Sequence, residues 1–330
     1  MTEPPLRRLR RLDVEELEAS RLSPAATLST ESKGRDHDEP PDENRTGFER
    51  DRDRILHSKA FRRLKHKTQV FMNPDGDHVV TRLTHTLQVT QIGRSIARYL
   101  GLNEPLAEAI CLGHDVGHSP FGHTGEDALT PYVAGEWHHA AQSVRVYEVL
   151  EPLNLTWEVR DGIRAHSWKI DPPPHTEEGQ VCRYADRIAY LTHDVEDAVR
   201  AGVIDHDDLP DGARRVFDTP GTGWITRMID AVVEESCRRG TVSMAERELA
   251  AMHELRDFMF EHVYLRPDAD DQRDRAIRVI RGLVDHFLQR PDEIPDTYRQ
   301  DDADVTTQAI DYVSGMTDRF ALREFDRITS

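Results

Sequence analysis

Residues 78–101 read HVVTRLTHTLQVTQIGRSIARYLG, and this stretch decides the fold class. Its apolar residues recur at the spacing of one face of an α-helix and not at that of a β-strand. These residues are Leu83, Leu87, Ile92, Ile96 and Leu100. Gly101 follows the last of them and is a typical helix stop. The stretch therefore predicts a long amphipathic helix, and that helix carries His85 near its beginning.

The same helical spacing recurs along most of the chain. Residues 104–118 begin with a proline in the first turn, and residues 181–202 repeat the apolar pattern and end in glycine. Further helical patterns follow at residues 224–237, 248–265, 275–289 and 306–325. Loops rich in proline and aspartate separate these segments, and no run alternates apolar and polar residues as a half-buried strand would. We therefore predict an all-α protein.

The first part of the chain has a different composition. Residues 29–46 are polar, contain proline and almost lack apolar side chains, which is typical of a flexible segment. We therefore predict a flexible N-terminal arm over residues 1–45 and a single all-helical domain over residues 46–330. Within this domain we expect a metal-site core at about 46–202 and a C-terminal helical part at about 220–330.

Charge and cysteine usage restrict the class of protein further. The formal charge is −18, so the average surface repels nucleic acid and anionic membranes. The three cysteines lie far apart without a CxxC motif, which favours a reducing compartment and excludes a thiolate zinc site. The apolar runs are too short for a membrane helix, and the N-terminus, MTEPPLRRLRRL, lacks the apolar stretch of a signal peptide. Its Leu/Arg repeat suits a partner-docking helix better than a membrane-surface helix, and we expect a cytoplasmic protein.

The segment LGHDVGHSPFGH, residues 112–123, concentrates possible metal ligands. It contains His114, Asp115, His118 and His123, and imidazole with carboxylate suits a borderline or hard divalent ion. An adjacent His-Asp pair at a helix end can direct both side chains to one ion. His85 and a carboxylate from a later helix would complete the site and leave positions for water and substrate. The alternative is that these histidines are structural.

The later carboxylate is Asp186, which lies off the apolar stripe of its helix. Tyr190 and Asp194 follow at i+4 and i+8, so the three residues share one face. A solvated face is the alternative, but an aromatic residue would usually turn inward. Asp194 therefore belongs to this face, and the second His-Asp pair, which begins at His193, is not the metal motif.

Residues 45–67 reverse the sign of the chain, with nine Lys/Arg against three acids. Such a segment favours an anionic ligand, because arginine forks match phosphate oxygens. A salt-bridged helix is the alternative for Arg50–Arg54. Arg62, Arg63 and Arg82 are better phosphate candidates, and the segment could also contact a single-stranded nucleic acid locally.

The ordered blocks of the chain resemble the HD superfamily of metal-dependent phosphohydrolases, and most closely the bacterial deoxyguanosinetriphosphate triphosphohydrolase-like proteins. The similar blocks are RDRDRILHSKAFRRLKHKTQVF, TRLTHTLQVTQIGRSIA, LGHDVGHSPFGHTGEDAL, HHAAQSVRV, YADRIAYLTHDVEDA and YVSGMTDRFAL. They run in order from about residue 45 to 325 and cover nearly the whole chain. Two departures are Gly47, where the family pattern has proline, and the absence of long insertions, which leaves strict guanine selectivity open.

The resemblance implies an HD-domain helical fold with additional C-terminal helices and hydrolysis of a deoxynucleoside triphosphate (dNTP) to deoxynucleoside and tripolyphosphate. It implies a divalent metal ion (Mg, Mn, Co, Ni or Fe) held by His85, His114, Asp115 and Asp186. His123 resembles the catalytic histidine, with Glu126 as its partner. The positions that resemble substrate contacts are Arg62, Gln69, Val70, Arg82, His118, His139, Arg187, Tyr190 and Asp194, and His166 is a weaker pocket candidate.

The family also implies a homo-oligomer, with a hexamer favoured. Two other readings stay open at this point. One is another HD reaction, a 5′-nucleotidase or a phosphodiesterase. The other is a nucleotide-sensing protein without catalysis, against which the intact ligand set argues.

Overall fold

The chain is described by a computed structural model that covers residues 6–69, 80–218, 220–264 and 270–330. Within these ranges the protein has fifteen α-helices and no β-strand, which confirms the predicted all-α class. Residues Thr68 and Thr81 form an isolated antiparallel bridge. No helix in the same ranges combines the length and apolar character that a bilayer crossing requires.

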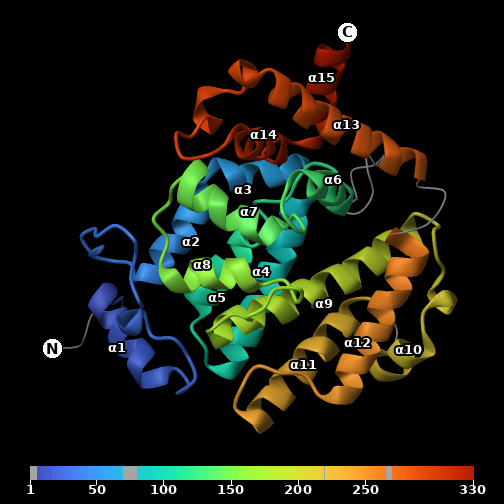
Figure 1. Cartoon of the computed structure of the whole chain (residues 1–330). Helices are drawn as coiled ribbons and strands as arrows, with labels where there is room; N and C mark the ends of the chain where they lie inside the picture. The colour runs from blue at the N-terminus through green and yellow to red at the C-terminus, as the bar shows by residue number, and fades with distance from the viewer. Residues whose placement is uncertain (1–5, 70–79, 219, 265–269) are drawn as a thin grey trace.

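A first hydrophobic core surrounds α4, α5 and α9 in the middle of the molecule (Figure 1). Its helices are α2 (Gly47–His57), α3 (Lys59–Arg63), α4 (Arg82–Leu100), α5 (Glu104–Gly113), α8 (Trp157–Ala165) and α9 (Glu177–Arg200). Helices α10 (Asp211–Phe217), α11 (Thr222–Arg239) and α12 (Glu246–Met259) add their apolar faces to it. Part of the predicted C-terminal region therefore packs with the first core.

Helix α4 shows how the sequence positions the site. The Thr81 side chain caps its start and Gly101, at φ 66°, ends it, as predicted. The buried stripe runs through His85, Val89, Ile92 and Ile96, at i, i+4, i+7 and i+11. Leu87, predicted on the apolar stripe, is instead 48% exposed, because the buried side of the helix is centred on the histidine.

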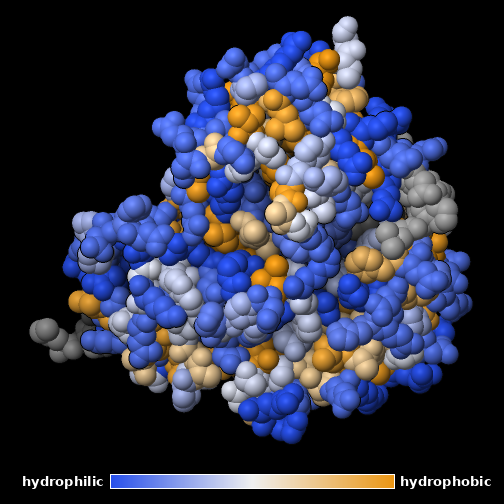
Figure 2. All heavy atoms as spheres, in the orientation of Figure 1, coloured by the Kyte–Doolittle hydropathy of each residue, from blue (hydrophilic) through white to orange (hydrophobic). Residues whose placement is uncertain are grey.

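A second hydrophobic core lies at the C-terminal end of the molecule, at the top of Figure 1. It unites α13 (Asp270–Gln289), α14 (Val305–Ser314) and α15 (Asp318–Thr329) with α6 (Gly122–Leu129), a helix from the middle of the chain. Helix α7 (His139–Arg145) lies between the two cores (Figure 1). Figure 2 shows that polar side chains cover most of the face in view, with apolar side chains gathered in small groups.

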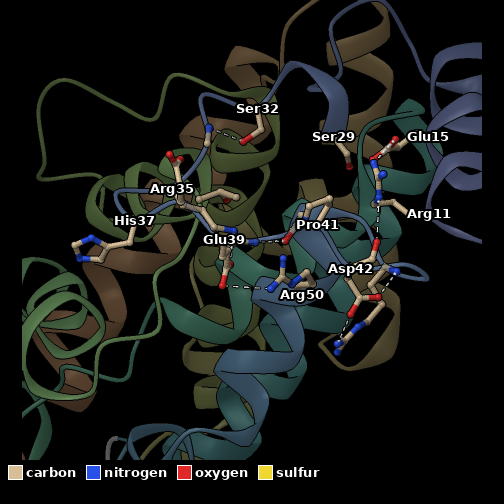
Figure 3. Close-up of a pocket in the computed structure, with 15 residues that line it drawn as sticks. Arg11, Glu15, Ser29, Ser32, Arg35, His37, Glu39, Pro41, Asp42 and Arg50 are labelled. Carbon is tan, nitrogen blue, oxygen red and sulfur yellow. Dashed lines mark hydrogen bonds and ion pairs between the residues drawn. The ribbon is translucent and has the colours of Figure 1, made fainter.

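The N-terminal segment differs from the predicted flexible arm. It forms α1 (Arg11–Arg21), and buried carboxylates hold the chain that follows. Glu178 accepts hydrogen bonds from Thr27, Glu158 accepts from the Lys33 backbone at 2.7 Å, and Arg35 pairs with Asp51. The segment lines a polar cavity of about 300 Å³, in which Glu39 pairs with both Arg35 and Arg50 (Figure 3). The reason is that the anchoring carboxylates lie mostly on later helices, which the composition of the arm does not reveal.

Candidate metal and catalytic site

Four segments meet where α5 ends. Helix α5 stops at Gly113, and His114 and Asp115 follow in the turn after it, although His114 itself still has helical backbone angles (φ −59°, ψ −37°). Helix α4 contributes His85 and Arg82, and α9 contributes Asp186. The turn approaches α7 so closely that a Cβ on Gly117 would lie 2.2 Å from the Ser143 backbone nitrogen. Glycine at this position therefore brings the turn against α7.

The predicted ligand residues come together in the structure. His85 Nε2 lies 3.1 Å from Asp186 Oδ1, and His114 Nε2 lies 3.8 Å from the same oxygen. His114 Nε2 is also 3.6 Å from Asp115 Oδ1. Their ligand atoms form clusters that could hold a metal ion, one of His85, His114 and Asp186 and a second of His114, Asp115 and His166.

The hydrogen bonding of the His114 ring is compatible with binding of a metal ion through Nε2. Its Nδ1 lies 2.7 Å from the Cys111 carbonyl oxygen, so Nδ1–H donates and Nε2 presents its lone pair to the cluster. Nε2 is buried and has no hydrogen-bond partner within the described part of the chain. A buried, unpaired imidazole nitrogen beside two carboxylates is what coordination of a divalent ion requires, and two imidazoles with two carboxylates suit such an ion.

His166 lies closer to the cluster than its weak sequence signal suggested. Its Nδ1 donates to the Ile163 carbonyl oxygen at 2.8 Å, so its Nε2 also faces inward. Burial, His114 and His139 lower the pKa of His166 to about 3, so the ring is neutral. His166 therefore lines the cluster wall, with Nε2 3.1 Å from His139 Nε2.

Glu126 is the centre of a second group of histidines. Its Oε1 accepts from His139 Nδ1 at 2.7 Å and lies 3.1 Å from His118 Nδ1. His123 Nδ1 is farther away, 3.5 Å from Oε2, and the His123 side chain is 68% exposed. The predicted partnership of His123 with Glu126 is thus one of three contacts, because the His118 and His139 rings stack 4.1 Å apart and both turn toward this carboxylate.

Three buried groups of this region, Glu126, His139 and His118, have shifted pKa values. Burial alone would raise the pKa of Glu126, but the charge of His139 outweighs it and holds this pKa well below its usual range. Burial lowers the pKa of His139, yet the charge of Glu126 leaves it raised overall. The pKa of His118 is lowered by burial and by Arg82. Glu126 with His139 therefore forms an ion pair, and His118 stays neutral beside it.

Two buried guanidinium groups belong to residues next to the ligand candidates: Arg82 pairs with Asp115, and Arg187 follows Asp186 on α9. Arg82 Nη1 donates to Asp115 Oδ2 at 2.7 Å, while its Nε has no partner among the described residues. Arg187 lies over the Trp168 ring, 3.9 Å from its centroid, and its Nε is likewise buried and unpaired in the part of the chain described. Unpaired buried donors are costly, so both arginines are suited to an anionic ligand.

Tyr190 and Asp194 share the face of α9 with Asp186, as predicted. Tyr190 packs partly buried against the first core, and Asp194 is buried. Asp194 Oδ2 accepts from the Tyr264 hydroxyl at 2.7 Å. His193 turns to the Ala189 carbonyl oxygen at 2.8 Å and takes part in none of the metal-capable clusters among the described residues, in keeping with the prediction that its pair is not the metal motif.

Some predicted contacts lie elsewhere. Arg62 is exposed, and its guanidinium donates to the carbonyl oxygens of Ser58 and His57, because it caps the end of the preceding helix. The structure therefore does not bring Arg62 to the cluster. Gln69 is partly buried and its Oε1 has no partner among the described residues, and Val70 lies outside them.

The basic segment is largely engaged internally. Arg45 and Arg52 both pair with Asp53, and Arg50 and Arg54 both pair with Glu39. The salt-bridged alternative for Arg50–Arg54 is the one that the structure supports, since these guanidinium groups already have carboxylate partners.

Sequence reasoning missed Tyr264, Trp168, Lys67 and Asp318. Tyr264 ends the π-helix η6 (Phe260–Tyr264), about seventy positions from the aspartate that it contacts, and no local pattern links the two. Lys67 and Asp318 lie inside the quoted blocks KTQVF and MTDRF, which was the available signal.

The helical fold and this cluster define a phosphohydrolase of the HD class. Residues 82–191, which contain all four predicted ligands, match the family model described as HD domain, and residues 242–327 match the Phosphohydrolase-associated domain. HD domains depend on a metal ion, in agreement with the His/Asp clusters.

Curated relatives narrow the class to one family. A deoxyguanosinetriphosphate triphosphohydrolase-like protein of Caldanaerobacter subterraneus subsp. tengcongensis is 47% identical over 320 residues, which cover 95% of this chain and 94% of the relative. Proteins of the same name are 43% identical in Clostridium perfringens (96% of this chain, 97% of the relative) and 36% identical in Geobacter metallireducens (94% and 96%). The chain belongs to the family of deoxyguanosinetriphosphate triphosphohydrolase-like proteins.

Proposed function

We propose that this protein hydrolyses deoxynucleoside triphosphates to deoxynucleoside and tripolyphosphate, with one divalent ion held by His85, His114, Asp115 and Asp186. The observation that carries the proposal is the position of Asp186, which stands in the ligand cluster and on the same helix face as Tyr190 and Asp194. One helix thus links a phosphate-binding centre to a polar surface suited to a sugar. The names of the relatives support the same substrate class.

When bound, the divalent ion would polarise the phosphoryl oxygens and make water a better nucleophile at neutral pH. The buried Nε groups of Arg82 and Arg187 would donate to phosphate oxygens, which supplies both of them with partners. Asp115 keeps Arg82 in place through its other carboxylate oxygen. These positive groups are in place before the substrate arrives, which is the condition for electrostatic stabilisation of the transition state.

His123 is the candidate general acid for the leaving 5′-oxygen. It is exposed, so it can reach a bound ester, while Glu126 lies behind it with Oε2 at 3.5 Å from Nδ1 and can orient the ring. The charge of His139 keeps Glu126 ionised, and its hydrogen bond at 2.7 Å and the contact of His118 Nδ1 at 3.1 Å fix the position of this carboxylate. We assign His118 and His139 to the phosphate side, where they face Asp115 at 3.7 Å and 3.9 Å.

Tyr190 and Asp194 are the candidate sugar contacts. Tyr190 lies one helical turn from Asp186, about 6 Å along the axis, which is close to the distance from an α-phosphate to the sugar ring. Its ring would leave no room for a 2′-hydroxyl and so reject ribonucleotides. Gln69 and Val70 join the proposed sugar contacts.

The spacing along α9 supports an α-phosphorus at the cluster, so water should attack there and expel the 5′-oxygen. In water labelled with heavy oxygen the label should enter tripolyphosphate and not the nucleoside. His123→Ala should keep its metal yet lose roughly 10²-fold in turnover, the scale of a lost general acid. Release of nucleoside monophosphate with pyrophosphate, or of diphosphate with phosphate, would contradict this orientation.

An HD-type nucleotidase or phosphodiesterase would use the same ligands with another pocket. Incubation of the metal-loaded protein with the four dNTPs, a deoxynucleoside monophosphate and a cyclic nucleotide separates these reactions by product. A metal-loaded protein that binds dNTPs without turnover would instead support a sensing role. We also propose a cytoplasmic homo-oligomer, with a hexamer favoured.

A further inference from the structure

Helix α6 carries His123 and Glu126, and it packs chiefly with α13 and not with the helices that carry the ligand candidates. Its apolar residues Ala128 and Leu129 are fully buried in the second hydrophobic core, together with Phe121 just before the helix. The other members of that core come chiefly from α13, α14 and α15, which Figure 1 shows beside α6. The helix of the proposed general acid, His123, is thus packed against the C-terminal helices, whereas the ligand candidates belong to segments of the first hydrophobic core.

The turn that leads into α6 is conformationally costly. Phe121 has φ 63° and Gly122 has φ 60°, and a left-handed conformation is unfavourable for a bulky residue such as phenylalanine. Such a conformation persists only where the surroundings over-determine it, at a cost of order 1–3 kcal/mol. The direction of His123, two residues on, depends on this turn.

Asp318, in the first turn of α15, provides the support. Its Oδ1 accepts the Phe121 backbone N–H at 3.2 Å. Its Oδ2 accepts the Thr68 backbone N–H at 3.0 Å and also the Thr68 hydroxyl. One carboxylate therefore ties the left-handed turn to the segment that contains Gln69.

Two further contacts attach the C-terminal helices to the same region. Lys67, fully buried, donates to the Ser314 carbonyl oxygen at the end of α14 at 2.9 Å and to the His118 carbonyl oxygen. Asp311 of α14 accepts from Gln142 at 2.8 Å and from Arg145 at 2.7 Å, both on α7, which begins with His139. The C-terminal helices thus hold the segments of all three histidines that face Glu126.

We propose that Asp318 is a positioning residue that aims His123 at the leaving oxygen, and that this is a principal role of the helices α13–α15. The inference rests on the proposed function, because it assigns Asp318 to act through His123. It predicts that loss of Asp318 impairs the chemical step while the metal ligands, which belong to the first core, are unaffected.

The test is a double-mutant cycle on the metal-loaded, full-length protein. Asp318→Ala should lower kcat by roughly 10-fold to 10²-fold, the scale of a misplaced catalytic group, with little change in KM or in bound metal. In a His123→Ala background the same substitution should produce no further loss, because Asp318 acts through that histidine. Asp304→Ala is the matched control. It removes another carboxylate at a helix start of the same unit, an exposed one that only caps α14 through the Thr307 N–H, and kcat should be unchanged.

Several outcomes would overturn the inference: an unchanged kcat in Asp318→Ala, an equal loss in both backgrounds, or a loss of bound metal. If Asp318→Ala does not fold, Asp318→Asn takes its place with the same criteria, since an amide keeps one acceptor oxygen but not two. Absence of dNTP turnover in the unaltered protein would count against the proposed function alone. The cycle would then be run on whichever phosphoester the protein does hydrolyse.

Discussion

Burial of Asp194 should make the stability of this protein depend on pH in a direction opposite to that of most carboxylates. Burial raises the pKa of Asp194 from 3.8 to about 7, although the hydrogen bond from Tyr264 and the nearby His85 and Arg82 oppose this rise. Asp197 is a nearby like charge that adds to it. The protonated carboxyl is therefore the form that the folded protein prefers.

The direction of this pH dependence follows from the pKa of Asp194 in the unfolded state, 3.8, and in the folded state, about 7. Below about pH 4 both folded and unfolded states hold the proton, and the group has no effect on the free energy of unfolding. Between about pH 4 and pH 7 the unfolded state is ionised and the folded state is not, so stability falls as the pH rises. The pKa of Asp194 differs by about three pH units between the unfolded and folded states. This difference corresponds to a loss of at most about 4 kcal/mol in the free energy of unfolding, and the full loss is reached above pH 7.

The assay is urea unfolding of metal-free protein between pH 5 and pH 8. Asp194→Asn keeps the size of the side chain and cannot ionise, so it should gain stability relative to the unaltered protein as the pH rises. Tyr264→Phe removes the hydrogen bond that lowers this pKa, and should shift the dependence to higher pH. Parallel pH dependences for the unaltered protein and Asp194→Asn would refute the argument.

Three further predictions concern the proposed function. His114→Ala and Asp186→Ala should each lose bound metal in elemental analysis together with activity, and a full metal equivalent in both variants would reject the ligand assignment. dGTP should be hydrolysed and GTP should not, with Tyr190→Ala narrowing the gap; equal turnover of the two by the unaltered protein would remove Tyr190 from this role. Light scattering at micromolar concentration should show a homo-oligomer, and a monomer with and without dNTP would contradict the proposed assembly.

The part of the fold that follows helical periodicity was predictable, and the part that depends on side-chain direction was less so. The stripe of α4 was visible in the sequence, but Leu87 was placed on its buried side because apolar character was taken as the guide. The buried side is set by His85, whose neighbours Asp186 and His114 come from other helices. Periodicity locates a helix more reliably than it locates the centre of its buried face.

Roles that depend on long-range contacts were the least accessible to sequence reasoning. Arg62 was a sound phosphate candidate by charge, but its guanidinium is occupied by carbonyl oxygens one turn back. Tyr264 has no local signal, because its partner lies on another helix. The composition of residues 29–46 likewise gave no sign of Glu158, which holds Lys33 from a distant helix, or of Glu178, which holds Thr27 just before this region. The metal-ligand candidates could be predicted because His85 and Asp186 lie on helices with a readable apolar pattern, while His114 and Asp115 form an adjacent pair at a helix end.

The distribution of positive charge reconciles the acidic chain with the proposed anionic substrate. The net charge of −18 is carried by a surface on which most arginines already have carboxylate partners, so it offers an approaching triphosphate little attraction. By contrast, the Nε groups of Arg82, which pairs with Asp115, and of Arg187, which follows Asp186 on α9, are buried without partners among the described residues. A buried donor without a partner costs about 1–3 kcal/mol. Phosphate oxygens that accept from these groups would remove this cost, so we expect affinity to be concentrated near the proposed ligands, where the metal ion and His123 would act on the same ester.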